Sequence, residues 1–244
     1  FYTNRSEELN HDLDVCLSHA RTADCTPEAL VVPHAGYVYS ESVAASAYKT
    51  LGQAADKIER VVLLGPAHRV PVKGIAVPSV DSFLTPLGDI PLDHAAILEL
   101  MALRLVEEND LAHQDEHSIE VQLPFLQSCL KDFKLVPILI GNASVDEVSR
   151  VLKQLWGDDK TLVVISTDLS HYHSYRDAQV LDKLTTDAVM HLQSSRIHAD
   201  NACGGTGLRA LLDVVRDKGL AAEVLDLRNS GDTAGSKDRV VGYG

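Results

Sequence analysis

Short apolar runs that end at a turn residue, with a titratable side chain immediately beyond, constrain the fold of this chain more than any other feature. The run at residues 29–33 ends on Pro33, and His34 follows directly. Runs of this length, bounded by Pro or Gly, are typical of strands that are covered on both faces. The same pattern occurs at residues 59–66 and 161–166, and the titratable residues that follow the three runs are His34, His68, Asp168 and His171.

Segments of helical composition alternate with these runs, which predicts an α/β fold with a central, mostly parallel or mixed sheet flanked by helices. At 244 residues with 45% hydrophobic content, the chain is expected to form a single domain, residues 1–244. The expected helices are 6–21, 40–52, 93–107 capped by Asp93, 145–155, 176–191 and one ending at 218, and the further expected strands are 74–78, 83–92, 135–140, 222–228 and 239–243.

The residues that follow the strands are expected to meet. Ligands of open α/β sheets bind beyond the carboxyl ends of the strands, so parallel strands would bring the four side chains to one rim: His34, His68, Asp168 and His171. The alternative is that each of these side chains caps its own loop. A second group, His113, Glu116, His117 and Glu120, shares one helical face if a helix begins near Asp115.

Two neutral imidazoles with one anionic ligand, and open positions for a substrate, are the donor set of mononuclear catalytic metal centres. From the residues alone, the third ligand is Asp168 or Cys203. Cys203 lies in a glycine-flanked loop ahead of an expected helix, where backbone N–H groups would lower its pKa toward the thiolate. The alternative for Cys203 is a small buried residue beside glycines.

Composition excludes several classes of protein. The chain has 35 acidic and 22 basic residues, a formal charge of −13 and no basic stripe, which argues against nucleic-acid binding. No apolar run approaches the length of a membrane span. No Gly-x-Ser-x-Gly elbow, P-loop or dinucleotide fingerprint is present. We expect a cytoplasmic protein, trimmed at both ends, with reduced thiols at Cys16, Cys25, Cys129 and Cys203.

Five motifs together carry a family resemblance: Pro33-His-Ala-Gly-Tyr37, Leu64-Gly-Pro-Ala-His68, Asp115-Glu-His-Ser-Ile-Glu120, Ser166-Thr-Asp-Leu-Ser-His171 and Val240-Val-Gly-Tyr243. In this order the chain resembles the MEMO family, called AmmeMemoRadiSam system protein B in prokaryotes. The resemblance implies a fold similar to the class III extradiol (LigB-like) dioxygenases.

The resemblance also implies roles for the residues. The metal ligands would be His34, His68 and Cys203, with His117 suited to proton transfer and Asp168 and His171 beside the metal. Iron is the cofactor expected first, with copper or zinc as alternatives. The family name suggests a radical-SAM enzyme and an AMMECR1-like protein as partners. His173 has no assignment.

The leading functional hypothesis is an iron- or copper-dependent, dioxygenase-like oxidoreductase that acts on an unknown small-molecule substrate. One alternative is a non-catalytic adaptor that binds phosphopeptides in the same cleft. Only Arg69, Arg176 and Arg209 lie near the motifs to support a phosphate pocket. The other alternative is a zinc-dependent hydrolase with the same ligands.

Overall fold

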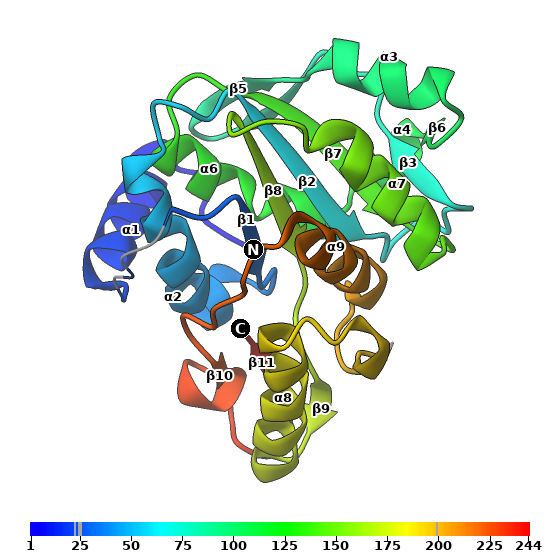
Figure 1. The fold of residues 1–244 in the computed structure, drawn as a ribbon. Helices are drawn as coiled ribbons and strands as arrows, with labels where there is room; N and C mark the ends of the chain where they lie inside the picture. The colour runs from blue at the N-terminus through cyan, green and yellow to red at the C-terminus, as the bar shows by residue number, and fades with distance from the viewer. Residues whose placement is uncertain (22, 24–25, 199) are drawn as a thin grey trace.

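The apolar runs form the centre of the fold in a computed structural model, which describes residues 1–21, 23, 26–198 and 200–244. They build a six-stranded sheet in which only the pairing of β3 with β7 is antiparallel. The predicted α/β fold with a mixed, mostly parallel sheet is confirmed (Figure 1). In spatial order the strands are β1 (Ala29–Val32), β8 (Thr161–Ser166), β2 (Arg60–Pro66), β7 (Lys134–Ile140), β3 (Ile75–Val77) and β6 (Glu107–Glu108).

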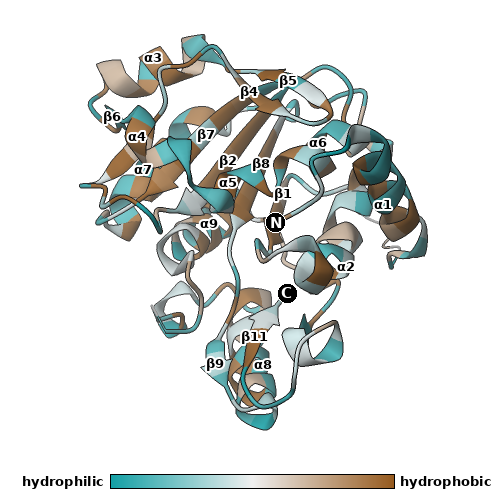
Figure 2. Ribbon diagram, turned by 180° about the vertical axis from the view of Figure 1, so that it is seen from behind, coloured by the Kyte–Doolittle hydropathy of each residue, from teal (hydrophilic) through white to brown (hydrophobic). Residues whose placement is uncertain are grey.

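Helices cover both faces of this sheet, which explains why its central strands read as unbroken apolar runs. Every residue of β8 is buried. Helices α7 (Val145–Leu155) and α9 (Gly205–Lys218) lie on one face, and α5 (His117–Glu120) and α6 (Leu123–Cys129) lie on the other (Figures 1 and 2). Helix α2 (Tyr37–Tyr48) packs on β1, and α1 (Ser6–His19) packs on α2 through Leu9 and Leu13.

Local sequence explains where several helices begin and end. Helix α7 starts with a capping box, in which Ser144 and Glu147 each accept a hydrogen bond from the backbone of the other. Helix α3 (His94–Ala102) begins at the predicted cap, Asp93, whose carboxylate accepts from the backbone N–H of Ala96. Helix α9 ends at Gly219, which has the left-handed φ of 70° that glycine adopts without strain.

The expected helix over residues 93–107 is too long. Helix α3 ends at Ala102, and Arg104 has a φ of 53°, which stops the helix. Residues Glu107 and Glu108 form β6 instead, because they pair with β3 at the sheet edge. Helix α2 begins at Tyr37, earlier than expected, and continues from Lys49 as the 3₁₀ turn η1 (Lys49–Gln53).

The structure also does not contain the single helix that was expected to begin near Asp115. The segment contains α4 (Asp110–Gln114), then α5 and α6. Glu116 lies between the first two as the N-cap of α5, where its carboxylate accepts backbone N–H groups and does not face outward on a helix. The group His113, Glu116, His117 and Glu120 therefore does not share a single helical face.

The expected strand over residues 222–228 is replaced by an irregular segment. Leu225 and Leu227 pack against the core without joining a ladder, so burial alone accounts for their apolar character. Pairing is confined to the short strand β10 (Arg228–Asn229). Short 3₁₀ turns also occur as η2 (Ser194–Arg196) and η3 (Ser230–Asp232).

A smaller antiparallel sheet lies below the main sheet in Figure 1, in the order β10-β11-β9. The expected strand at 239–243 appears as β11 (Val240–Tyr243), whereas β9 (His171–His173) was not foreseen. Helix α8 (Tyr175–Met190) packs on β9 and β11. The expected strands near 83–92 form the hairpin of β4 (Ser82–Thr85) and β5 (Gly88–Pro91).

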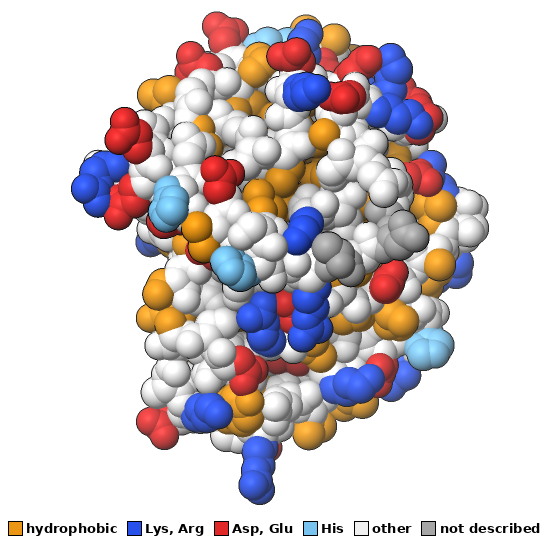
Figure 3. All heavy atoms as spheres, turned by 90° about the vertical axis from the view of Figure 1, so that its left-hand side faces the viewer, with side chains coloured by type: hydrophobic (Ala, Val, Ile, Leu, Met, Phe, Trp, Pro, Cys, Tyr) orange, Lys and Arg blue, Asp and Glu red, His pale blue; other side chains and the backbone are white. Residues whose placement is uncertain are grey.

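On the face seen in Figure 3, Lys and Arg side chains are interspersed with Asp and Glu. Among the helices of the described residues, none has the length and apolar character needed to cross a lipid bilayer. Cys16, Cys129 and Cys203 are free thiols, and Cys25 lies outside the described residues.

Candidate metal centre

Three neighbouring strands of the main sheet end at the same rim. Strand β8 lies between β1 and β2, with Ser166 opposite Val32 and Ile165 opposite Leu64. The residues that leave these strands therefore emerge side by side. The rings of His34 and His68 lie with their centroids 5.2 Å apart. The structure thus brings together side chains that the chain separates widely.

His34 is buried and its orientation is fixed by one serine. Its Nδ1 lies 2.9 Å from Ser166 Oγ. The Ser166 hydroxyl donates its single proton to the carbonyl of Ser118 at 2.5 Å, so towards His34 it can only accept. The proton on the His34 ring must then be on Nδ1. His34 Nε2 is consequently the ring nitrogen that faces the rim, within hydrogen-bond distance of Cys203 Sγ.

Gln122 completes this network. Its amide nitrogen donates to the carbonyl of Pro33 at 2.9 Å and to Ser166 Oγ at 3.0 Å, and its oxygen accepts from the Tyr48 hydroxyl at 2.9 Å. The carbonyl partner fixes which end of the amide is nitrogen. Both lone pairs of Ser166 are thereby used, one by Gln122 and one by His34. The buried network leaves a single possible tautomer for His34.

His68 is oriented in the same way by a carboxylate. Its Nδ1 lies 3.0 Å from Glu116 Oε1, and its backbone N–H donates to Glu116 Oε2 at 2.5 Å. Burial raises the pKa of Glu116, but the hydrogen bonds from His68 and from the backbone of Ser118 outweigh burial and lower it to about 2. Glu116 is therefore ionised and His68 Nδ1 carries a proton, which directs Nε2 toward the centre.

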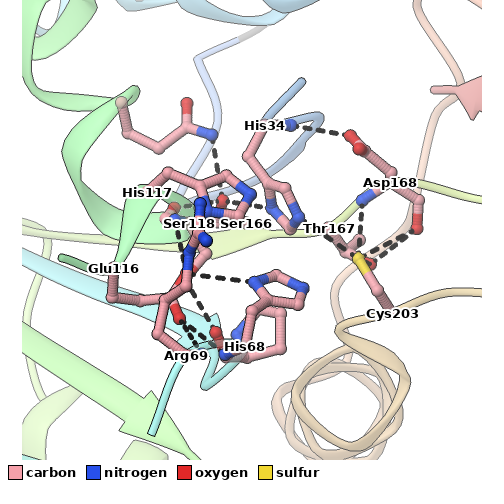
Figure 4. Close-up of polar contacts among 12 residues, drawn as sticks. His34, His68, Arg69, Glu116, His117, Ser118, Ser166, Thr167, Asp168 and Cys203 are labelled. Atoms are coloured by element: carbon pink, nitrogen blue, oxygen red, sulfur yellow. Dashed lines mark hydrogen bonds and ion pairs between the residues drawn. The ribbon is translucent and has the colours of Figure 1, made fainter. Parts of the chain in front are cut away.

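Cys203 approaches both histidines from the loop before α9. Its Sγ lies 3.3 Å from His34 Nε2 and accepts from the backbone N–H of Asp168 at 3.3 Å (Figure 4). Burial raises the pKa of the Cys203 thiol, but hydrogen bonds from His34 and His68 outweigh burial and lower it to about 6. The hydrogen bond that His68 donates to Cys203, followed by the one that it donates to Glu116, raises the pKa of His68 to about 9.

A glycine makes this approach possible. A Cβ at Gly204 would lie 2.7 Å from Thr167 Cβ and 2.9 Å from the Ser166 carbonyl oxygen. The backbone N–H of Gly204 donates to Thr167 Oγ1 at 2.8 Å, which ties the cysteine loop to the end of β8. Only a residue without a Cβ fits this contact without displacing its neighbours.

The donor set fits a metal ion. Metal bonds of about 2.0–2.3 Å, at angles between 90° and tetrahedral, place a nitrogen and a sulfur ligand about 3.1–3.6 Å apart. The separation of 3.3 Å between His34 Nε2 and Cys203 Sγ lies within this range. A hydrogen bond between thiolate and imidazole has a similar length. The distance alone therefore does not distinguish a metal site from a hydrogen bond. The argument for a metal depends on the Nδ1 protons, which are fixed on both histidines and leave both Nε2 atoms as possible metal ligands.

His117 adds a third imidazole. Nitrogen atoms of His34, His68 and His117 all lie within 4.8 Å of one another, which is close enough for one ion. The His117 ring stacks on Phe1 at 4.5 Å and on His68 at 4.9 Å. Burial, followed by the charge of His34, lowers the pKa of His117 to about 4, so its ring is neutral at pH 7.

The orientation of His117 differs from that of the other two histidines. Its Nδ1 lies 3.4 Å from Glu116 Oε1 without forming a hydrogen bond, and this buried nitrogen has no other partner among the described residues. Histidines that ligate metals almost always donate their second N–H to a fixed partner. By this criterion the rings of His34 and His68 are oriented as those of metal-binding histidines are, whereas no such partner orients His117 among the described residues.

Asp168 and His171 lie on the same rim. The buried Asp168 accepts from the His34 backbone N–H at 2.7 Å, and burial raises the pKa of its carboxyl group. His171 Nδ1 donates to the Leu169 carbonyl at 2.8 Å, which leaves Nε2 free. Both residues, with the three imidazoles, line a cavity of about 680 Å³ between the two sheets. His173 is exposed on β9 and is not among the lining residues.

Several residues of this centre have no role in the sequence-based prediction. The sequence singles out Glu116 only as part of a charged group, and Ser166 only as part of a motif. Nothing in the sequence distinguishes Gln122 from other glutamines, because its role depends on contacts with β1 and β8. Of the three arginines considered for a phosphate pocket, only Arg69 lines the cavity.

The family model and the similar proteins that match this chain indicate the same family. Residues 1–244 match the model of the Memo-like protein family. The chain is similar to a MEMO1 family protein of Aquifex aeolicus, with 33% identity over 256 aligned residues that cover 100% of this chain and 94% of the relative. A MEMO1 family protein of Methanosarcina mazei is 34% identical with the same coverage.

Among solved structures, the chain is similar to an uncharacterized protein from Escherichia coli K12. The match covers 88% of this chain and 98% of that protein, with 16% identity and a TM-score of 0.48. A likeness at this level is too weak to support an argument about function.

Proposed function

This chain belongs to the Memo-like family, and we propose that it is a metal-dependent oxidoreductase whose metal is held by His34, His68 and Cys203. The observation that carries the proposal is the fixed tautomer of both histidines. Ser166 and Glu116 each hold an Nδ1 atom, so that both Nε2 atoms face the Cys203 sulfur and can bind a metal in place of a proton. Such preorganisation is expected at a metal site and has no evident use in a purely structural pair of histidines.

The donor set favours a metal that accepts a soft ligand. Two imidazoles and a thiolate suit iron or copper, and also zinc. A bound redox metal would supply electron transfer and activation of a small substrate, whereas zinc in the same position would supply Lewis-acid chemistry for hydrolysis. We propose iron, with copper as the alternative within the same reaction class.

The proposed acid and base is His117. It is neutral near pH 7, because burial holds its pKa at about 4, and no hydrogen bond from the residues that the structure describes fixes its tautomer. A neutral imidazole at the edge of the cavity can accept a proton from a bound substrate and return it later. Asp168 and His171 lie on the same cavity wall, where we assign them the orientation of the substrate or of water.

Element analysis of anaerobically prepared protein tests the ligand assignment. We expect about one metal ion per chain in the wild type, and its loss in His68→Ala and Cys203→Ser with an unchanged far-UV circular dichroism spectrum. His173→Ala is the matched control, because this exposed imidazole lies outside the cavity. Full metal content in His68→Ala would overturn the proposed site.

The same samples separate the remaining alternatives. We expect His117→Ala to retain its metal, since His117 is assigned to proton transfer. Loss of metal in His117→Ala would instead assign the three imidazoles of His34, His68 and His117 as the ligands. Zinc in the wild type, with no iron or copper, would favour hydrolysis over oxidation.

A further inference from the structure

The cavity around the proposed metal site has a charge opposite to that of the protein as a whole. The chain has a formal charge of −13, yet two arginines, Arg69 and Arg239, line this cavity. Asp168 is the one carboxylate among its described lining residues. That carboxylate is buried and already accepts a hydrogen bond from the backbone of His34. The mouth of the cavity is therefore locally cationic.

The two arginines come from opposite walls. Arg69 directly follows His68 beyond the end of β2, and its backbone N–H donates to Glu116 Oε2 at 3.3 Å. Arg239 directly precedes β11, whose residues Val240 and Val241 pair with β9. The main sheet thus supplies one guanidinium and the small sheet supplies the other. Both are anchored by ordered backbone close to the centre.

Neither guanidinium is neutralised within the protein. Within the described residues, no Asp or Glu carboxylate oxygen lies within 4.0 Å of the guanidinium group of Arg69 or of Arg239. An isolated exposed arginine is common and needs no explanation. Two arginines without partners that share one cavity repel each other, and this repulsion is relieved when an anion binds between them.

We propose that Arg69 and Arg239 form an anion-binding subsite at the mouth of the cavity, which takes the carboxylate or phosphate group of a small substrate. Guanidinium groups bind such oxyanions through paired N–H donors and remain charged at every physiological pH. The inference deepens the proposed function, because it gives the substrate a charged group by which it is held beside the metal. The role of the subsite in holding a substrate rests on the proposed function. Anion binding itself does not, because it requires no metal.

Alkylation of Cys203 in metal-free protein tests this subsite, because the thiol lies 3.3 Å from Nε2 of His34, which lines the cavity. Iodoacetate carries a carboxylate, and iodoacetamide is its neutral counterpart. We expect the ratio of their rate constants at Cys203 to exceed the ratio at an exposed model thiol by at least about 10-fold at low ionic strength. Both reagents react with the same thiolate, so a change in the fraction of thiolate affects both rate constants equally. The ratio therefore reports only the preference for the anionic reagent over the neutral one.

Variants assign the preference to the two arginines. Arg69→Gln and Arg239→Gln should each lower the ratio several-fold, while Arg150→Gln, which removes an exposed charge from α7, should leave it unchanged. An unchanged ratio in both cavity variants would overturn the proposal, as would a wild-type ratio equal to that of the model thiol. Metal content of the same variants is measured in parallel, so that failure of the metal site is recognised separately.

A competition arm distinguishes the two oxyanions. Inorganic phosphate and acetate are each tested for protection of Cys203 against iodoacetamide, with chloride at matched ionic strength as the blank. Protection by phosphate that disappears in Arg69→Gln and Arg239→Gln assigns a phosphate subsite, and the same result with acetate alone assigns a carboxylate subsite. Protection that is equal for chloride and both oxyanions contradicts the proposal.

Discussion

His34 Nε2 and Cys203 Sγ lie 3.3 Å apart, although 169 residues separate them in the chain. The contact depends on two independent pieces of local structure. One is the end of β1, where Pro33 stops the ladder and His34 turns onto the rim. The other is the glycine after Cys203, which lets its loop touch β8. The pair therefore reports directly on whether the rim is correctly assembled.

The first prediction concerns the reactivity of Cys203 in metal-free protein. Its pKa of about 6 makes roughly 90% of the thiol a thiolate at pH 7, whereas burial raises the pKa of Cys16 and of Cys129 to about 12. Iodoacetamide at pH 7 should thus label Cys203 well before the other two, as followed by peptide mass spectrometry. Below pH 6 the labelling rate should fall about 10-fold per pH unit as the thiolate is protonated.

His68→Ala is the informative variant in this experiment. It removes one of the two imidazole N–H groups that stabilise the thiolate, so the midpoint of the rate profile should move toward the ordinary thiol pKa of 9.0. His173→Ala, the exposed control, should leave the midpoint in place. A wild-type midpoint near 9 would show that the imidazole contacts do not form in solution.

The parts of the fold that follow from local sequence were predicted well. Buried strands are recognisable because two-sided burial requires unbroken apolar residues, and helix starts at Asp93 and Ser144 follow from capping chemistry. The strand predicted at 222–228 is not formed. Residues that pack against a core and residues that pair in a sheet are both apolar, so the sequence does not distinguish the two cases. The helix expected from Asp115 is not formed as predicted because the Glu116 carboxylate binds His68, two residues beyond the end of β2, and no local pattern reveals this contact.

The candidate metal centre likewise contains residues that the sequence predicts and residues that it does not. The strand ends placed His34, His68 and Asp168 on one rim because the topology of a parallel sheet leaves little choice. The residues that orient them could not be found in this way. Ser166 and Gln122 act through contacts across the sheet, and Arg239 comes from a small sheet whose strand β9 was not foreseen.

Ser166→Ala tests whether the tautomer of His34 matters. The substitution removes the acceptor for His34 Nδ1 and leaves a buried Gln122 N–H without its partner. Metal affinity, measured by competition with a chelator, should fall about 10- to 100-fold, and the free energy of unfolding should fall by about 1–3 kcal/mol. Ser149→Ala is the control, since that buried hydroxyl has no partner among the described residues. Equal metal affinity in the two variants would contradict the role of Ser166.

Glu116→Gln tests the second orienting group. The carboxylate accepts from the backbone of His68, Arg69 and Ser118 as well as from the His68 ring, and an amide would present a donor to some of these N–H groups. Stability at pH 7 should fall by about 1–3 kcal/mol or more, and metal affinity by about 10- to 100-fold. Glu7→Gln, at an exposed position on α1, should change neither.

The pH dependence of this difference has a definite sign. The pKa of Glu116 is lowered in the folded protein from 4.5 to about 2, so the native state binds fewer protons than the unfolded state between these values. The stabilisation is therefore complete above about pH 4.5 and is lost as the pH falls toward 2. Urea unfolding of wild type and Glu116→Gln should converge over this window. A stability difference that stays constant from pH 7 to pH 3 would contradict the ionised state of Glu116.

Gly204→Ala tests how the loop that carries Cys203 is held. The added methyl group would lie 2.7 Å from Thr167 Cβ and 2.9 Å from the Ser166 carbonyl oxygen, and the end of β8 is fixed by its pairing with β1. The cysteine loop must therefore move away from the sheet, at a cost of about 1–3 kcal/mol in the free energy of unfolding. This displacement should separate Cys203 from His34, so metal should be lost and the labelling midpoint of Cys203 should rise. Gly157→Ala, where a Cβ meets nothing within 4 Å, should change unfolding by less than about 0.5 kcal/mol and retain the metal.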